Sequence, residues 1–566
     1  ILRVIIILLF VMLAVSLFYV QVFRGNYFYS LSVNNRIRAV SLEGQRGRIF
    51  DREGRIVADS RLSFDVTILP QDADDRDSLF AYLSQVLSVD QSVLNTRYHQ
   101  RRKTPFSPVI IAEDVDKKIA MVLEENRYRF PGLYIQETFR RWYPFGKAAA
   151  HLLGYVGKID NEKIKRLKQY GYTQQSIVGY SGIEEYYDRY LMGKEGGQQI
   201  EVDSRGRQVR LLGIREPERG RDIQLTVDIR MQEIVLNALN GKPGAAVIVD
   251  IDSGEVLALV SSPSFDANVF NDAGKSRERA RLFVDPDAPM LNRAIRGQYP
   301  PGSIFKVVVS AAGLMENAIN RQTTFFCPGY FKLGNMRFRC THSHGDQNVI
   351  QALEHSCNVF YYNTGLLLGP DPMHRYARLF GLGSLTHIDL PAEETGFVPS
   401  SKKRRGRQTG WYKGDTVNLS IGQGDLLTTP VQVARMMAAV ALNGKIVDLR
   451  LLKSIDGEPL VISSTAKNLP LRQEVVRMLQ EGLRAVVASS TGTARLLNMK
   501  GFEISGKTGT AQSVPGKDSH AWFAGYSLQG KKRIAFCILL EYGGSSSNAV
   551  RVTKQILEQF RKENIL

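Results

Sequence analysis

An uncharged, almost wholly apolar segment from Val4 to Phe23, flanked by Arg3 and Arg24, constrains this chain more than any other stretch. About 20 apolar residues are enough to cross a bilayer as a helix. A cleaved signal peptide would have a shorter apolar core followed by a small-x-small site, which this segment lacks. We therefore expect residues 1–24 to be an uncleaved transmembrane anchor, with the rest of the chain exported.

The remainder of the chain is too large for one ordinary domain. At 566 residues, two or three domains are expected. The net charge of +18 raises nucleic acid as a partner. The chain contains no zinc-finger pattern, RNA-recognition signature or basic helix-turn-helix, and an anionic lipid surface or cell-wall polymer explains the charge as well. We therefore expect a membrane partner and no nucleic acid.

A serine and a lysine three residues apart, Ser303 and Lys306, follow the turn signal Pro301-Gly302 and open a mostly apolar stretch. On a helix these positions share a face, so the hydroxyl and the amine can meet. A serine becomes a nucleophile when a base takes its proton, and a desolvated lysine with a lowered pKa can be that base. Alone, such a pair more often means a helix N-cap followed by a solvated lysine.

Two further elements follow in order and change that interpretation. They are Ser356-Cys357-Asn358, in a stretch predicted to be helical, and Lys507-Thr508-Gly509-Thr510. Serine-x-x-lysine, serine-x-asparagine and lysine-threonine-glycine in this order are the signature of penicillin-binding proteins and class A β-lactamases. The C-terminal part of the chain therefore resembles a penicillin-binding protein.

The N-terminal part carries a second resemblance. The segment Arg46-Gly-Arg-Ile-Phe-Asp-Arg-Glu-Gly54 lies within a predicted strand–turn–strand and resembles the start of the pedestal in class B penicillin-binding proteins. Further similar blocks are Arg141–Gly157, Tyr180–Asp188, Asn292–Gly302, Ser420–Pro430 and His520–Gly525. Together they are most similar to the elongation-specific group, penicillin-binding protein 2, although the division-specific transpeptidases share the three core motifs. The adjacent acids Glu184 and Glu185 are expected on a solvated helix face rather than as a glycosidase pair.

The resemblance implies a multidomain α+β fold. The expected parts are a transmembrane anchor over 1–24, a β-rich pedestal of the dimerisation type over 25–220, and a transpeptidase domain over 221–566. The last would hold an antiparallel sheet with flanking helices and a helical subdomain. Local patterns agree: a helix over Thr226–Leu239 with a threonine cap, a hairpin joining Ala245–Asp250 to Glu255–Val260, a strand over Arg533–Leu540 and a closing helix over Asn548–Phe560.

The resemblance also assigns roles to the motif residues. Ser303 is the nucleophile that forms an acyl-enzyme, and Lys306 is its base. Ser356 relays a proton to the leaving amine, and Asn358 contacts a substrate amide. Lys507 supplies positive charge that keeps Lys306 neutral and attracts the substrate carboxylate. The remaining assignments concern the substrate-binding residues Thr508, Gly509 and Thr510, with hydroxyl contacts from the two threonines and an oxyanion hole made by the backbone N–H groups of Ser303 and Thr510.

The implied function is β-lactam-inhibited D,D-transpeptidation during cell-wall elongation. The substrate would be a peptidoglycan stem peptide ending in D-Ala-D-Ala, and no cofactor is required for the chemistry. Expected partners are a SEDS-family glycan polymerase and the scaffold proteins of the elongation complex, at the cytoplasmic membrane with the catalytic domain outside. Alternatives are a division-specific transpeptidase, a D,D-carboxypeptidase, a penicillin-sensing receptor, a β-lactamase and a catalytically idle scaffold.

A cysteine- and histidine-rich segment lies between the first two motifs. Cys327, Cys340, His344 and Cys357 form a set suited to tetrahedral zinc, which would fix the positions of Ser356 and Asn358. A disulfide between Cys327 and Cys340 is the alternative in an exported protein. The fourth cysteine, Cys537, lies in a strand pattern and is expected in the core.

Overall fold

The computed structural model describes residues 2–28, 37–73, 75–102, 104, 107–173, 176–202, 208–405, 410–459, 466–530 and 532–565. By their internal contacts the residues group into two compact units. Unit 1 comprises residues 1–47, 60–141 and 192–221, and unit 2 comprises residues 48–59, 142–191 and 222–566.

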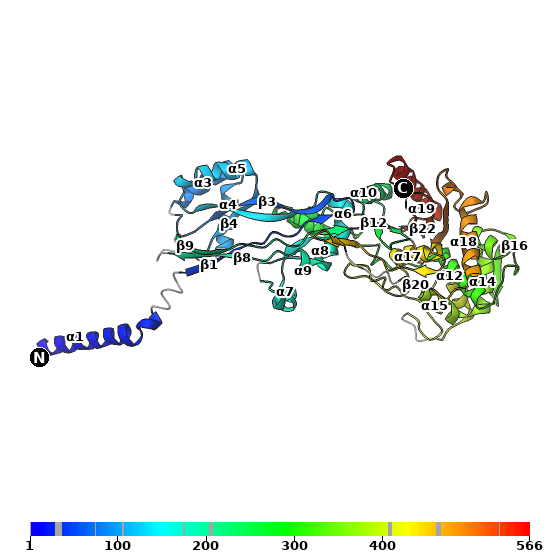
Figure 1. The fold of residues 1–566 in the computed structure, drawn as a ribbon, viewed down its shortest axis with the longest axis horizontal. Helices are drawn as coiled ribbons and strands as arrows, with labels where there is room; N and C mark the ends of the chain where they lie inside the picture. The colour runs from blue at the N-terminus through cyan, green and yellow to red at the C-terminus, as the bar shows by residue number, and fades with distance from the viewer. Residues whose placement is uncertain are drawn as a thin grey trace. The chain divides into compact units, whose positions relative to one another are not determined.

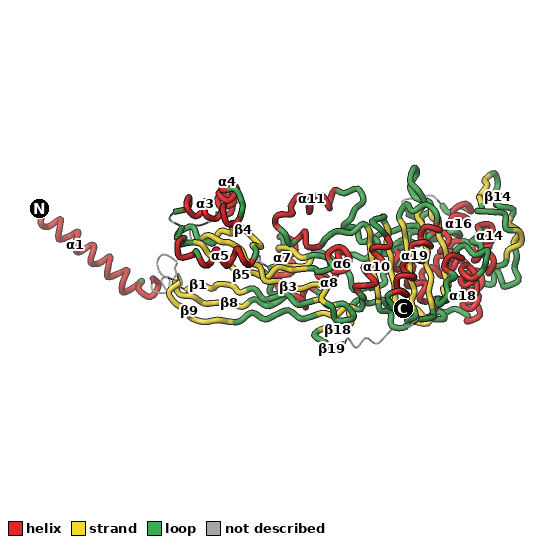
Figure 2. Tube along the Cα trace, turned by 90° about the horizontal axis from the view of Figure 1, so that it is seen from above, coloured by secondary structure: helices red, strands yellow, loops and turns green. Residues whose placement is uncertain are grey.

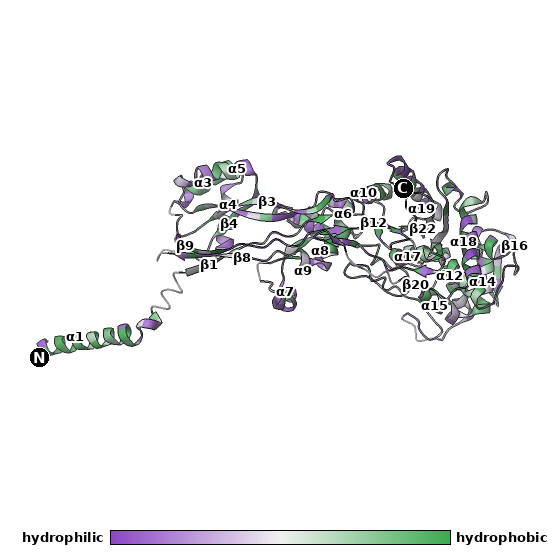
Figure 3. Ribbon diagram, viewed as in Figure 1, coloured by the Kyte–Doolittle hydropathy of each residue, from purple (hydrophilic) through white to green (hydrophobic). Residues whose placement is uncertain are grey.

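The N-terminal apolar segment is helical. Helix α1 (Leu2–Phe18) continues as a π-helical turn over Tyr19–Phe23, and none of these side chains is buried against the rest of the protein. Figure 3 shows the apolar character of α1 along its length. Within the described part of the chain, residues 2–23 form the one helix that is long and apolar enough to cross a membrane.

Beyond the N-terminal apolar helix, the described residues of unit 1 form two groups of strands and three α-helices. Strands β1 (Ile37–Leu42), β8 (Gly196–Val202) and β9 (Gln208–Arg215) pair in antiparallel fashion. Figure 2 shows the three strands side by side. A second group joins β3 (Ile56–Ile68) to β4 (Val109–Val115) and β5 (Leu133–Trp142). Helices α3 (Arg76–Leu87), α4 (Gln91–Arg101) and α5 (Lys117–Glu125) share its apolar core.

Each of these three helices begins after an aspartate. The side chains of Asp75, Asp90 and Asp116 accept hydrogen bonds from backbone N–H groups of the first turn. Such N-caps satisfy donors that have no partner inside the helix. The helix starts in unit 1 are therefore set locally by the sequence.

The predicted strand–turn–strand after Arg46 is confirmed. Strand β2 (Ile49–Phe50) pairs with the first residues of β3, and Gly54 in the connecting turn has a φ of +81°. The buried Asp51 carboxylate accepts from the backbone N–H groups of Glu53 and Arg55. The sheet extends from β2 to its other neighbour, β10 (Ile223–Leu225). It then continues through β18 (Leu452–Ile455) to β19 (Glu458–Pro459).

The centre of unit 2 is a five-stranded antiparallel sheet in the order β12-β11-β23-β22-β21. Its strands are β11 (Gly244–Asp250), β12 (Val256–Ser262), β21 (Ile504–Ala511), β22 (His520–Ser527) and β23 (Ile534–Leu540). Nearly every residue of these strands is buried, because helices cover both faces. The predicted hairpin, the predicted strand near Arg533 and the burial of Cys537 are confirmed.

Alternate side chains of this sheet enter two different cores. Val247 and Trp522 belong to the core that also contains α12 (Lys306–Met315) and α17 (Pro430–Ala441). Their chain neighbours Ile248 and Phe523 belong to the core formed with α10 (Ile229–Leu239) and α19 (Ser546–Lys562). Because successive strand residues point to opposite faces, a strand covered on both sides reads as a continuous apolar run.

A helical layer lies on the α12 side of the sheet. Helices α12, α14 (Asn358–Leu368), α15 (Pro370–Leu379) and α18 (Gln473–Ala488) pack together there (Figure 1). Shorter helices of the same layer are α13 (Val349–Glu354) and α16 (Lys413–Ser420). The antiparallel sheet with flanking helices and a helical subdomain agrees with the expected α+β fold.

Unit 2 also contains smaller elements. These are α6 (Gly146–Leu153), β6 (Val156–Lys158), α7 (Asn161–Leu167), β7 (Ile177–Gly179), α8 (Gly182–Tyr186), α9 (Asp188–Leu191), α11 (Ser276–Val284), β13 (Phe325–Cys327), β14 (Tyr330–Leu333), β15 (Met336–Arg339), β16 (Gly345–Gln347), β17 (Lys445–Ile446) and β20 (Lys467–Asn468).

Two local predictions are wrong. Helix α10 is capped by Asp228, whose side chain accepts from the N–H of Arg230, whereas the Thr226 hydroxyl donates to the carbonyl of Val256. Glu184 is fully buried rather than solvated, because α8 packs against α6 and the Tyr143 hydroxyl donates to its carboxylate at 3.4 Å.

Candidate active site

One pocket in unit 2 brings the three motifs together. Its volume is about 650 Å³. The motif residues that line it are Ser303, Ser356, Asn358, Thr508 and Thr510. Lys306 and Lys507 lie beneath it, both 0% exposed, and their side chains reach Ser356 from two different elements.

Ser303 lies in a short 3₁₀ turn, Gly302–Phe305, directly before α12. Two hydrogen bonds hold this turn. The N–H of Gly302 donates to the carbonyl of Gly422 at 3.0 Å, and the Trp522 indole donates to the carbonyl of Pro300 at 3.1 Å. Gly302 itself has a φ of +56°, which glycine adopts at little cost. The nucleophile candidate is thus fixed by its backbone.

The expectation that the Ser303 hydroxyl meets the Lys306 amine is not what the resting structure shows. The α-helix begins at Lys306 rather than at Ser303. Among the described residues, no hydrogen bond joins the two side chains. Instead the Lys306 amine donates to the carbonyl of Ser356 at 2.7 Å and to Oδ1 of Asn358 at 2.6 Å, and it lies 3.2 Å from the Ser356 hydroxyl.

The second motif lies at a break between two helices and not inside one, which corrects the sequence-based prediction. Helix α13 ends at Glu354 and α14 begins at Asn358. Ser356, between them, has a φ of +56°, an uncommon conformation for a serine. This break turns its hydroxyl toward Lys507 and its carbonyl toward Lys306, so one residue serves both lysines.

Lys507 lies on β21, next to the nucleophile turn. Its amine donates to the Ser356 hydroxyl at 2.9 Å and to the carbonyl of Thr508 at 3.1 Å. Gly509 allows β21 to approach that turn, because a Cβ there would lie 2.9 Å from the carbonyl oxygen of Pro301 and 3.0 Å from Ile304. The glycine of this motif is therefore required by the close packing of strand and turn.

Burial shifts both lysines toward their neutral forms. It lowers the pKa of Lys306 to about 8, although the neighbouring cysteine thiols act in the opposite direction. Burial also holds the pKa of Lys507 well below its ordinary value, and the charge of Lys306 adds to this shift. Both shifts are in the direction that favours a neutral amine, and the charge of Lys306 is one cause of the lowering at Lys507. The expected division, with Lys507 charged and Lys306 neutral, stays a prediction.

Several residues of the pocket were not found by sequence reasoning. Thr493 follows α18 and shares a hydrogen bond of 2.9 Å with the Thr508 hydroxyl. Arg337 and Arg339 reach the pocket from β15. Gln423 lies within the Ser420–Pro430 block that resembled the family, so that block offered a signal for it, whereas Thr493 had none.

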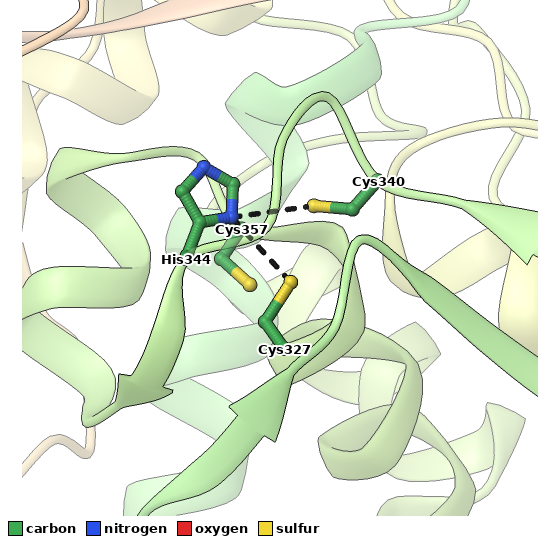
Figure 4. Close-up of side chains that lie close together, drawn as sticks. All are labelled: Cys327, Cys340, His344 and Cys357. Carbon is green, nitrogen blue, oxygen red and sulfur yellow. Dashed lines mark hydrogen bonds between the residues drawn. The ribbon is translucent and has the colours of Figure 1, made fainter.

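The four predicted metal ligands also come together. The ligand atoms of Cys327, Cys340, His344 and Cys357 lie within 4.8 Å of one another. Figure 4 shows the four side chains close together. Nδ1 of His344 lies 3.5 Å from Sγ of Cys327 and 3.6 Å from Sγ of Cys340. All four cysteines of the chain are free thiols, so the alternative Cys327–Cys340 disulfide is not formed.

The cysteine cluster is continuous with the second motif. The backbone N–H of Asn358 donates to Sγ of Cys340 at 3.2 Å. A hydrogen bond from Cys357 and those from the backbone hold the pKa of the Cys340 thiol well below its ordinary range, and the pKa of Cys357 rises correspondingly. Because Cys357 separates Ser356 from Asn358, the position of the cluster sets the position of both.

Comparisons with known proteins agree with this geometry. The family model of the penicillin-binding protein transpeptidase domain matches residues 244–559, and that of the penicillin-binding protein dimerisation domain matches residues 41–225. The peptidoglycan D,D-transpeptidase MrdA of Haemophilus influenzae is 30% identical over 99% of this chain and 91% of its own length.

Solved structures show the same similarity. The penicillin-binding protein PBP2 of Helicobacter pylori, solved in complex with MreC, has a TM-score of 0.82 at 27% identity, covering 94% of this chain and 100% of its own. A chain from a peptidoglycan synthase complex that couples polymerization and crosslinking has a TM-score of 0.75 at 30% identity, covering 98% of this chain and 97% of its own.

Proposed function

The chain belongs to the penicillin-binding protein 2 family of peptidoglycan D,D-transpeptidases, and we propose how its own residues form and resolve the acyl-enzyme. The enzyme crosslinks stem peptides during cell-wall elongation. The observation that carries the mechanism is the network in which Lys306, Ser356, Asn358 and Lys507 meet beneath the pocket that contains Ser303.

Lys306 is the base for Ser303 in this proposal. A neutral lysine amine has two N–H donors and one lone pair. The carbonyl of Ser356 and Oδ1 of Asn358, at 2.7 and 2.6 Å, match the two donors. The lone pair is then available for the proton of the Ser303 hydroxyl one turn away, a contact that substrate binding would tighten.

In the acylation step, Ser303 replaces the terminal D-Ala on the donor peptide. Ser303 Oγ attacks the carbonyl carbon of the penultimate D-Ala, so a C–O bond forms and the C–N bond to the terminal D-Ala breaks. The serine proton passes through Lys306 and the Ser356 hydroxyl to the leaving amine. Ser356 suits this relay because its hydroxyl lies 3.2 Å from the Lys306 amine and 2.9 Å from that of Lys507. In the second step the amine of another stem peptide attacks the ester and Ser303 regains its proton.

We assign the remaining motif residues to substrate binding. Asn358 contacts the donor amide, and the hydroxyls of Thr508 and Thr510 contact the terminal carboxylate. The backbone N–H groups of Ser303 and Thr510 form the oxyanion hole, supported by the close approach of the nucleophile turn to β21. Losing one such donor costs about 10²–10³-fold in rate.

The lining of the pocket favours transfer over hydrolysis. The described residues that line it include no carboxylate. A class A β-lactamase uses a glutamate to activate the deacylating water. A long-lived acyl-enzyme is therefore expected with β-lactams, which separates this enzyme from the lactamase alternative.

The test is intact mass after exposure to benzylpenicillin, on wild type and Ser303→Ala. We expect a stable adduct on the wild type that is absent from the variant. Turnover of the drug without a lasting adduct would support a lactamase. No adduct on the wild type would contradict the proposed acyl-enzyme and favour an idle scaffold.

We further propose a structural zinc at Cys327, Cys340, His344 and Cys357. Tetrahedral bonds of about 2.3 Å to sulfur and about 2.1 Å to nitrogen place these atoms about 3.6 Å apart. The sulfur–nitrogen separations of 3.5 and 3.6 Å fit that value. A zinc bound there would cross-link the segment after β13 to the start of α14 and so hold Ser356 and Asn358 in place.

We propose the following placement and organisation for the chain. Residues 1–24 anchor it in the cytoplasmic membrane, residues 25–220 form the pedestal and residues 221–566 the transpeptidase domain, outside the cytoplasm. The exposed apolar helix α1 supports the anchor. The relatives solved with MreC and in a peptidoglycan synthase complex support scaffold proteins and a SEDS-family polymerase as partners.

A further inference from the structure

A two-stranded hairpin, β14–β15, forms part of the pocket wall. Arg337, Phe338 and Arg339 of β15 all line the pocket. In the antiparallel register Arg337 is opposite Lys332 and Arg339 is opposite Tyr330. Because alternate strand residues share a face, the two arginines project from the same side of β15.

The hairpin is fixed to the second motif by its other face and by its end. The rings of Phe331 and Phe338 pack against Tyr362 of α14, with centroid separations of 5.8 and 5.7 Å. The carbonyl of Arg339 accepts hydrogen bonds from Nδ2 of Asn358 at 3.2 Å and from the Tyr362 hydroxyl at 3.1 Å. Arg339 is therefore held directly beside the residue assigned to the donor amide.

The two guanidinium groups are exposed cations without an anionic partner. Among the described residues neither Arg337 nor Arg339 forms an ion pair, and the described lining of the pocket contains no Asp or Glu. The Arg337 guanidinium lies 3.6 Å from the centre of the Tyr330 ring, which restrains its orientation. A pocket wall with two guanidinium groups that have no anionic partner, one of them restrained by an aromatic ring, is complementary to a carboxylate, which arginine binds in bidentate geometry.

We infer that Arg337 and Arg339 bind a side-chain carboxylate on the donor stem peptide, carried by the residue that precedes D-Ala-D-Ala. The inference rests on the proposed function, because Asn358 is assigned to the donor amide and Arg339 lies next to Asn358. The terminal carboxylate is assigned to Thr508 and Thr510 on β21, so the hairpin serves a second carboxylate. The pair of arginines would then select anionic donors over neutral ones.

The experiment measures how well two matched peptides slow the acylation of the full-length protein by benzylpenicillin. The peptides are N-acetyl-glutamyl-D-Ala-D-Ala and N-acetyl-glutaminyl-D-Ala-D-Ala, which differ only in the side-chain carboxylate. For each protein the result is the ratio of the two concentrations that halve its own acylation rate, so a change in benzylpenicillin reactivity cancels. The proteins are wild type, Arg337→Gln/Arg339→Gln and the control Lys332→Gln, a cation of the same hairpin outside the pocket lining.

At low ionic strength we expect the wild-type protein to favour the glutamyl peptide roughly tenfold, because charge-assisted hydrogen bonds at a part-exposed site contribute a difference in binding of about that size. The preference should weaken as salt screens the charges. The double variant should show a ratio of about one, and Lys332→Gln should keep the wild-type ratio. Both substitutions are at exposed positions, so folding should be retained, as circular dichroism can verify.

Equal competition by the two peptides in wild type would overturn the inference. So would a preference that Lys332→Gln removes as fully as the double variant, since that would reflect the general charge of the hairpin. Failure of the proposed function is a different observation: wild type would not be acylated by benzylpenicillin at all.

Discussion

Replacing Gly302 by alanine is the substitution that tests most directly how the nucleophile is positioned. Gly302 begins the turn that carries Ser303 and has a φ of +56°. A Cβ there would lie 2.7 Å from the carbonyl oxygen of Thr510 and 3.0 Å from its carbon. These are backbone atoms of β21, which is paired along its length with β22, so they cannot rotate away as a side chain would.

Two contributions set the expected size of the effect. The left-handed conformation costs an alanine about 1 kcal/mol more than a glycine. Overlap with packed backbone costs about 1–3 kcal/mol. The total of about 2–4 kcal/mol is relieved most directly by moving Ser303 away from Thr510, which would widen the proposed oxyanion hole. We expect the acylation rate to fall roughly 100-fold, the scale of losing one oxyanion donor.

The assay is the second-order rate constant of acylation by benzylpenicillin, measured on samples with a native circular dichroism spectrum. Gly457→Ala is the matched control, because Gly457 also has a positive φ, +81°, but a Cβ there would meet no atom within 4 Å. The control should lose stability without losing acylation. A folded Gly302→Ala protein that acylates within about threefold of wild type, less than 1 kcal/mol, would refute the positioning argument.

Two further predictions concern the base and the metal. Acylation requires neutral Lys306, and burial lowers the pKa of this lysine to about 8. The acylation rate should therefore be maximal above that pH and fall about tenfold per pH unit below it. A rate that stays flat in stopped-flow measurements as the pH falls from 8 to about 6 would exclude Lys306 as the base. Cys340→Ser should remove zinc from the native mass spectrum and lower the melting temperature. The control Cys537→Ser, at a fully buried strand position, should keep the metal. Wild-type protein that purifies without zinc and is unaffected by chelators would contradict the metal site.

Local sequence signals predicted the elements that local interactions form. The hairpin between β11 and β12 follows from two β-rich runs around a tight turn, and Gly54 marks the turn before β3. The strand near Arg533 and the closing helix are likewise predicted from their own local sequence. The wrong cap at Thr226 shows the limit of this reasoning, because two good capping residues lie two positions apart and packing selects Asp228.

The sequence by itself determined which chemistry is present: a serine, two lysines and an asparagine in the order of a known signature, with three cysteines and a histidine between them. Only the tertiary structure decided how these groups act on one another. Ser356 is 50 residues from Lys306 and 151 from Lys507, and they meet because β21 packs beside the nucleophile turn while α13 and α14 break between Glu354 and Asn358. Burial, which lowers the pKa values of both lysines and encloses Glu184, depends on which elements pack against each segment. That information is carried by distant segments, so no local pattern can supply it.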